Sequence, residues 1–329
     1  MRNHLLLSVM LVLASVAAWA QGPRFDAANP SAHDPVMAKE GDTYYVFTTG
    51  MGVSCMTSKD LKTWAPGYSI FSQAPGWVTD LMPDFRNHMW APDIFRYKGE
   101  WHIFYSCSRF GRNTSVIGHV SSPTLDPSRP DFKWTDHGMV VQSVPDRDMW
   151  NAIDPNFVLD EDGTPWMDFG SFWNGIMMVK LDENLQVAEP QEWINICRRE
   201  RTFDLDPSDP GDGAVEAPFI YKHGDYYYLF ASFDYCCRGA NSTYKVAVGR
   251  SKSARGPFLD KEGKDMAKGG GSVLIEGNKT DYVAIGHNAA YTIDGRDLFI
   301  SHIYMAGRGD SRLFIRDITW QDDWPVVTF

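Results

Sequence analysis

One sequence unit recurs five times along this chain of 329 residues, and the recurrence constrains the fold more than any single motif does. Each unit starts at an acidic or proline-marked position and soon reaches a turn glycine followed by an aromatic or apolar run. The five starting positions, at near-constant spacing, are Asp34, Asp93, Asp154, Glu216 and His287. The turn glycines that follow them are Gly41, Gly99, Gly163, Gly224 and Gly295. Such periodicity is typical of folds built by repetition.

Between these positions the sequence favours short β strands separated by Gly, Pro, Asn and Asp turns, with no long stretch of helical period. Four strands per unit make one blade of a propeller, so we expect an all-β fold, a five-bladed β-propeller. A β-sandwich would not explain the near-constant phase of the units. In a propeller the first strand of every blade lines the central channel, so equivalent residues converge there.

The N-terminus has the pattern of a signal peptide. Arg2 and His4 precede the apolar run from Leu5 to Ala18, and Ala18-Trp19-Ala20 has the small-x-small form of a cleavage site. The run is too short for a membrane anchor. We therefore expect a signal peptide over 1–20, a single catalytic propeller domain over 21–329, and a secreted or periplasmic protein. Because Trp324–Val327 follows soon after the fifth unit, we expect no added β-sandwich domain.

Charge and composition narrow the class of partner. A net charge of −11 disfavours nucleic acid and anionic membranes, because neither is attracted to an acidic surface. The chain has 12 Trp, 14 Tyr and 19 Phe, which suits a neutral, ring-shaped ligand that stacks on aromatic faces. We expect no nucleic acid partner, no membrane partner and a monomer.

The five cysteines do not form a disulfide framework, because their number is odd. No metal-binding CxxC or HExxH spacing is present. We expect reduced thiols, also at the adjacent pair, for which a strained bridge is the alternative. The cysteines are Cys55, Cys107, Cys197, Cys236 and Cys237.

Three of the five starting positions carry carboxylates that a propeller would direct at one channel: Asp34, Asp154 and Glu216, which we place at the same phase. Taken alone, each of these acids would be interpreted as a residue at the end of a strand. We assign that structural role to Asp93, which follows its proline. Three converging carboxylates repel each other, so the cluster indicates function. Glycoside hydrolysis uses two carboxyl groups, one as acid and one as base or nucleophile, and a third acid can raise the pKa of the first.

The segments around these positions resemble the α-1,5-L-arabinanases of glycoside hydrolase family 43. The resemblance covers nearly all of the mature chain, in the same order. It rests on His33-Asp34-Pro35, Trp90-Ala91-Pro92-Asp93-Ile94, Ala152-Ile153-Asp154-Pro155, Val215-Glu216-Ala217-Pro218, Phe233-Asp234-Tyr235-Cys236-Cys237-Arg238-Gly239 and Gly286-His287-Asn288.

The resemblance implies a five-bladed propeller that hydrolyses arabinan and arabino-oligosaccharides with inversion. By position, Asp34 resembles the general base, Glu216 the general acid, and Asp154 the residue that tunes and orients Glu216. Inversion needs base and acid about 6.5–9.5 Å apart. His287 resembles the residue at a central cation site, generally calcium reached largely through water, although calcium itself prefers oxygen ligands.

Sugar contacts are less specific, because core packing explains an aromatic residue equally well. We take Trp90, Phe110 and Trp173 as candidates for stacking on sugar rings. Candidates for hydrogen bonds to hydroxyls are His33, Asn151, Ser171 and Arg308.

The sequence thus predicts an endo-α-1,5-L-arabinanase. The resemblance around Cys236-Cys237 favours it over related exo-acting arabinofuranosidases and β-xylosidases. Exo-acting cleavage of arabinan remains an alternative, because a slightly longer loop can block one side of a groove. A sugar-binding propeller without turnover is the other alternative, and the complete acidic trio argues against it.

Overall fold

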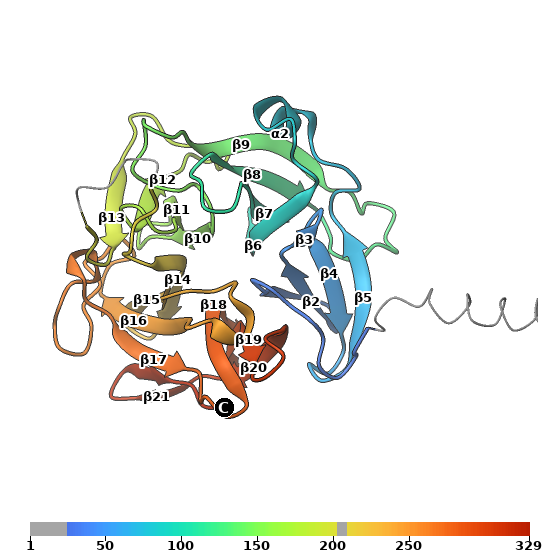
Figure 1. Cartoon of the computed structure of the whole chain (residues 1–329). Helices are drawn as coiled ribbons and strands as arrows, with labels where there is room; N and C mark the ends of the chain where they lie inside the picture. Colours follow the sequence, from blue (N-terminus) through green and yellow to red (C-terminus); the bar gives the residue numbers. More distant parts are fainter. Residues whose placement is uncertain (1–24, 203–208) are drawn as a thin grey trace, which may run out of the picture.

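The molecule consists of antiparallel sheets arranged around a central axis as a five-bladed β-propeller, which confirms the predicted fold class (Figure 1). The computed structural model describes residues 25–202 and 209–329, so the predicted signal peptide lies outside the described residues. Within those two ranges, no helix has the length and apolar character needed to cross a membrane.

The blades follow one another in chain order. Blade one contains β1 (Val36–Glu40), β2 (Thr43–Thr48), β4 (Ser54–Ser58) and β5 (Trp64–Ser69). Blade two contains β6 (His88–Tyr97), β7 (Glu100–Cys107), β8 (Ser115–Ser122) and β9 (Thr135–Ser143), with β3 (Gly50–Met51) beside β6. Blade three contains β10 (Asn156–Leu159), β11 (Pro165–Phe169), β12 (Ile176–Lys180) and β13 (Trp193–Cys197).

Blade four contains β14 (Val215–His223), β15 (Tyr226–Phe233), β16 (Lys245–Ser251) and β17 (Ser272–Glu276). Blade five contains β18 (Tyr282–Ile293), β19 (Arg296–Met305) and β20 (Ser311–Asp317). A small sheet of β21 (Thr319–Gln321) and β22 (Trp324–Val326) follows. The short helical segments are α2 (Gly76–Leu81), η1 (Gly239–Asn241) and η2 (Met266–Lys268).

The predicted turn glycines connect the first strand of each blade to the second. All five have positive φ, between 54° and 91°, which glycine adopts without steric cost. The sequence therefore identified the five tight turns correctly. They are Gly41, Gly99, Gly163, Gly224 and Gly295.

The ring is closed by the segment that precedes blade one. Ser31 forms a β-bridge with Arg312 of β20, and the Leu313 N–H donates to the Pro30 carbonyl oxygen at 3.1 Å. This segment thus covers part of the outer edge of blade five, whose own sheet has three strands. Closure of this kind removes edges that would otherwise pair with other chains.

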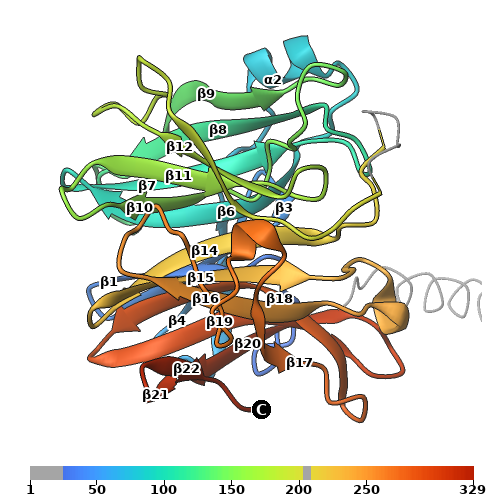
Figure 2. The same cartoon turned by 90° about the vertical axis from the view of Figure 1, so that its left-hand side faces the viewer.

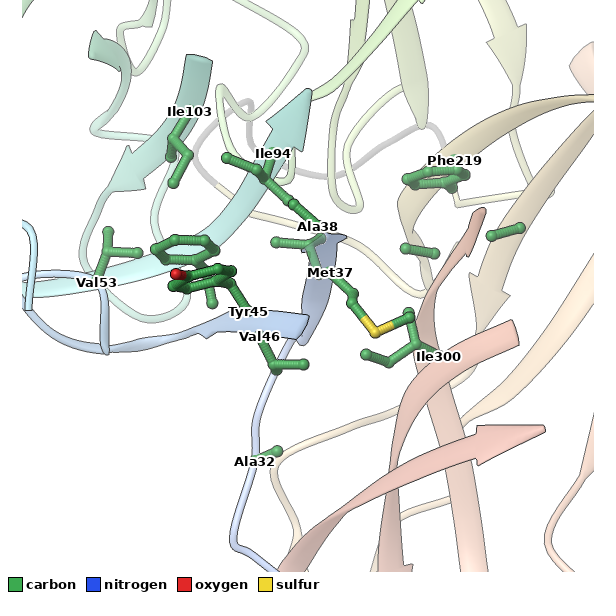
Figure 3. Packing of buried hydrophobic residues seen from close by; sticks show 14 of the residues in the cluster. Ala32, Met37, Ala38, Tyr45, Val46, Val53, Ile94, Ile103, Phe219 and Ile300 are labelled. Carbon is green, nitrogen blue, oxygen red and sulfur yellow. The ribbon is translucent and has the colours of Figure 1, made fainter. Parts of the chain in front are cut away.

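The hydrophobic core lies between neighbouring blades. Met37 of β1 is 1% exposed and lies near Phe219 of β14 and Ile300 of β19 (Figure 3). Ile94 of β6 is on the other side of β1 in the same cluster (Figure 3). Such contacts bury the inner strands on both faces, and the blades stack as layers around the axis (Figure 2).

The later halves of the five inner strands surround a cavity of about 520 Å³ on the axis. Every blade contributes to it, as the ring geometry requires. The carboxyl groups of Asp34, Asp154 and Glu216 do not line it. The inner strands begin at the other end of the channel. The acidic trio lies at that end, separate from this cavity.

Three stacked histidines run across blade two. Nδ1 of His102 on β7 is 2.9 Å from Nε2 of His119 on β8, and the rings of His119 and His137 on β9 are 4.4 Å apart. His119 is 2% exposed. Its burial, together with the neighbouring His137 and His102, lowers its pKa from 6.5 to about 2.

We predict that these histidines make the protein sensitive to acid. Below pH 6.5 the unfolded chain binds a proton at His119 that the folded chain does not, so the free energy of unfolding falls by about 1.4 kcal/mol per pH unit. Urea unfolding between about pH 6.5 and 4.5 should show this slope, and His119→Gln should flatten it. An identical slope in the variant would contradict the prediction.

Candidate active site

Every blade has a residue with a left-handed backbone just before its inner strand or within it. In β6, β14 and β18 it belongs to a β-bulge, which re-aims the side chains around it. Such a conformation is costly for residues other than glycine, so its recurrence marks a functional position. The five residues, with φ between 42° and 58°, are Asp34, Ala91, Asp154, Ala217 and His287.

This recurrence corrects one sequence prediction. Glu216 is not at the phase of Asp34 and Asp154, because Ala217 is the left-handed residue of blade four and Glu216 precedes it. Glu216 instead pairs in register with Ser232, and the bulge follows it. Asp154 nevertheless lies close to this part of blade four, since the Ala217 N–H donates to its Oδ2 at 3.1 Å and its carboxyl group interacts electrostatically with that of Glu216.

The backbone N–H of each left-handed residue donates to a side chain of the preceding blade. Four acceptors come from the end of a second strand or the residue after it. They are Thr49 Oγ1 for Ala91 (2.8 Å), Ser106 Oγ for Asp154 (3.1 Å), Ser232 Oγ for His287 (2.8 Å) and His302 Nδ1 for Asp34 (3.1 Å). The corresponding position in blade three is Gly170, which has no side chain, and Asp154 Oδ2 replaces it as the acceptor for Ala217.

Asp34 is surrounded by imidazoles. Its Oδ1 is 3.0 Å from Nδ1 of His287, 3.7 Å from Nε2 of His33 and 3.6 Å from Nδ1 of His302. Burial alone would raise its pKa, but the charges of His287 and His33 hold it well below the usual 3.8. Thr49 also donates its hydroxyl to Oδ2. Asp34 is therefore ionised at neutral pH.

Two of the three imidazoles carry the compensating charge. Burial lowers the pKa of His287 and of His33, but the Asp34 carboxylate outweighs it and raises both to about 9. Burial keeps the pKa of His302 well below 6.5. Neutral His302 can thus accept the Asp34 N–H. Donor atoms of His33, Asp34 and His302 lie within 4.8 Å of one another, a spacing that could hold a metal ion, while Nδ1 of His302 is already used to accept the Asp34 N–H.

Glu216 lies in an environment that favours its protonated form. Burial raises its pKa above 4.5, although hydrogen bonds to it from Ser171 and Tyr244 lower it in part. Ser171 Oγ is 2.7 Å from Oε2, and the Tyr244 hydroxyl is 2.8 Å from Oε1. Tyr244 packs on Gly286, where a Cβ atom would come within 2.1 Å of its ring. The two hydroxyls fix the direction of the carboxyl group.

Asp154 is the second carboxyl group that favours a proton. Burial raises its pKa well above 3.8, His287 opposes this, and the nearby Glu216 and Asp34 raise it further. The pKa values of the three acids are therefore pushed in opposite directions: that of Asp34 is lowered, and those of Asp154 and Glu216 are raised. Environments that push the pKa values of neighbouring acids apart are the basis of general acid and base catalysis.

Of the predicted sugar contacts, two lie beside the acidic trio. His33 flanks Asp34, and its ring stacks on His302 with centroids 4.2 Å apart. Ser171 is buried and bonded to Glu216, so it orients the carboxyl group.

Three other predicted sugar contacts, Trp90, Asn151 and Arg308, pair with residues outside the acidic trio. Trp90 donates Nε1–H to His88 at 3.0 Å, and buried Asn151 accepts from Ser115 at 2.6 Å. Phe110 is 79% exposed, whereas Trp173 is 3% exposed. The side chain of Arg308 is 77% exposed and faces Asp310.

Tyr244, His302 and Thr49 contact the trio, yet the sequence analysis did not single them out. His302 and Thr49 pair opposite the residue that precedes a left-handed residue, as Ser106 and Ser232 do. A search for polar residues opposite the repeat positions in each second strand could have found them.

Comparisons with known proteins match this geometry. The model of the glycosyl hydrolases family 43 matches residues 28–325. An extracellular exo-α-(1→5)-L-arabinofuranosidase of Cellvibrio japonicus (strain Ueda107) is 47% identical, over 99% of this chain and 92% of the relative. An extracellular endo-α-(1→5)-L-arabinanase of Bacillus subtilis (strain 168) is 39% identical, over 94% of this chain and 91% of the relative.

A solved structure, an α-L-arabinanase of Cellvibrio cellulosa complexed with arabinohexaose, is similar with a TM-score of 0.89. Its sequence is 48% identical, and the match covers 91% of this chain and 96% of that chain.

We predict that Asp154 supports blade four through its acceptor oxygen. Asp154→Asn and Asp154→Ala both remove the acidic proton and the charge, but only Asn can still accept the Ala217 N–H. An unsatisfied buried N–H costs about 1–3 kcal/mol, so the Ala variant should have a free energy of unfolding lower by that amount. Denaturant unfolding of both variants measures the difference, and equal stability would refute the role.

Proposed function

The chain belongs to family 43 of the glycosyl hydrolases and is an enzyme of the arabinanase group of that family, and from this premise we propose that it hydrolyses α-1,5-L-arabinofuranosidic bonds of linear arabinan with inversion. The observation that carries the proposal is the opposite environment of the two acids: three imidazoles surround Asp34 and its pKa is lowered, whereas Glu216 is buried beside two hydroxyls and its pKa is raised. Both relatives reported above are named as extracellular, which supports export of this chain as well.

In the proposed mechanism Asp34 is the general base and Glu216 the general acid. The Asp34 carboxylate takes a proton from a water molecule, whose oxygen attacks the anomeric carbon from the face opposite the leaving group. Glu216 gives its proton to the glycosidic oxygen as the bond breaks. We assign Asp154 the role of tuning and orienting the acid: the carboxyl groups of Asp154 and Glu216 interact electrostatically, and Asp154 supports the backbone behind Glu216 through Ala217.

Two modes of action on the polymer are candidates, cleavage within the chain (endo) and cleavage from a chain end (exo). The sequence predicts endo action, and the 39% identical relative bears an endo-arabinanase name. The 47% identical relative is named exo-acting, and this observation favours cleavage from a chain end as the second candidate. The chemistry at Asp34 and Glu216 is the same in both cases.

We predict that the purified chain releases arabinose-containing products from debranched linear arabinan. A mixture of oligomers at early times indicates endo action, whereas a single short product indicates end-directed action. Glu216→Gln should lower kcat on the order of 10²–10⁴-fold, because the amide cannot supply the proton. Glu262→Gln, an exposed glutamate substitution, is the matched control and should be fully active. An active Glu216 variant would remove the acid assignment.

We also propose a calcium ion held through water near His287. Nδ1 of His287 faces Asp34, a common arrangement for a metal-binding imidazole whose other nitrogen is the ligand. In the described ranges no residue is hydrogen-bonded to that other nitrogen, Nε2, and the charges of Asp34, Asp154 and Glu216 act on this ring. To bind the ion, Nε2 would have to release its proton, while Nδ1 keeps its proton directed at Asp34. One nitrogen ligand is few for calcium, so water must complete the shell. The cation would then replace the positive charge that His287 loses and keep Asp34 ionised.

Calcium should therefore bind the folded protein with or without substrate. We expect calcium to produce a heat signal in isothermal titration and to raise Tm, since a ligand that binds only the folded state stabilises it. His287→Gln should lose both effects, whereas His137→Gln in blade two should keep them. Equal calcium binding by the His287 variant would exclude this site.

A further inference from the structure

Two adjacent cysteines stand beside the candidate active site, and the hydrolytic mechanism uses neither. Both are free thiols: Cys237 is exposed, and Cys236 is half-buried. The other three cysteines are free as well, but they are buried within blades. Cys237 is therefore the one exposed cysteine of the five.

The backbone holds the sulfur of Cys237 against His33. Sγ is 3.7 Å from Nε2 of His33, and the same nitrogen is 3.7 Å from Oδ1 of Asp34. Cys237 has φ of 64°, a left-handed conformation that costs a residue other than glycine about 1–3 kcal/mol. Its N–H donates to the Tyr304 hydroxyl at 2.9 Å, which helps to keep this conformation. The sulfur is thus placed one imidazole ring away from the general base.

A thiol next to an imidazole becomes a nucleophilic thiolate. The hydrogen bond from Cys236, and then His33, lower the pKa of Cys237 from 9.0 to about 5 against the effect of burial. Burial instead raises the pKa of Cys55 and of Cys197 to about 12. Electrostatics and accessibility therefore both select Cys237 as the reactive cysteine.

We propose that Cys237 is a reversible modification site for low-molecular-weight disulfides, and that its modification blocks the candidate active site. The Cys237 thiolate attacks one sulfur of the disulfide R–S–S–R. A bond forms between the two sulfurs, and the second sulfur leaves as the thiolate RS⁻. The cysteine sulfur is oxidised, the leaving sulfur is reduced, and no proton is transferred. A thiol reductant reverses the exchange.

The consequence for activity rests on the proposed function. Since His33 contacts both the sulfur and Asp34, a group added at the sulfur occupies the approach to the general base. The added group therefore lowers the rate of hydrolysis.

The test uses methyl methanethiosulfonate, which transfers a methylthio group to thiolates. We expect peptide mass spectrometry to find the group on Cys237 first, arabinan hydrolysis to fall ~10-fold or more in step with labelling, and dithiothreitol to restore it. Cys237→Ser should hydrolyse arabinan and resist the reagent. Cys197→Ser, a buried control, should be inactivated like the unmodified sequence.

Labelling of Cys237 without loss of activity would overturn the proposal, as would a Cys237→Ser variant that the reagent still inactivates. Slow labelling of Cys237, no faster than that of Cys55, would overturn it too. If the chain does not hydrolyse arabinan at all, the proposed function fails, while rapid and selective labelling of Cys237 still supports the modification site. Protection of Cys237 from labelling by arabinohexaose would further support its place in the candidate active site.

Discussion

The ion pair between His287 and Asp34 joins the last blade to the first, and the charge state of the whole candidate active site depends on it. A buried carboxylate is costly unless an opposite charge compensates it. His287 and His33 provide this charge, so the pKa of Asp34 stays low while burial raises the pKa values of Asp154 and Glu216. These groups come from four blades, and only the closed ring brings them together.

The hydrogen bonds between blades make this arrangement rigid. Each left-handed residue at the start of an inner strand is held by a side chain of the blade before it. Blade three departs from the pattern, because Gly170 has no side chain and Asp154 takes over the acceptor role. The Asp154 carboxyl group thus supports the backbone next to Glu216 and also interacts electrostatically with the Glu216 carboxyl group. This coupling explains why a residue that transfers no proton in the proposed mechanism belongs to the centre of the site.

Much of the fold and part of the site were accessible from the sequence. The repeat and the turn glycines predicted the five blades, because both are local patterns that a blade imposes on its own sequence. The acidic trio was recognised by residue type and order. The position of Glu216 within the repeat was not recognised, since it depends on where the β-bulge lies relative to the pair of Glu216 and Ser232. Tyr244 and His302 were missed because their importance comes from contact with other blades.

By itself, the sequence determined the number of blades, the tight turns and the members of the acidic trio, because each of these follows from residue types that recur at a regular spacing. The tertiary structure alone decided which acid has a lowered pKa and which acids have raised pKa values. A pKa depends on burial and on charges within a few ångströms, and His287 lies more than two hundred residues from Asp34 along the chain. It likewise decided that Cys237 meets His33, since only closure of the ring brings blade four to the segment before blade one.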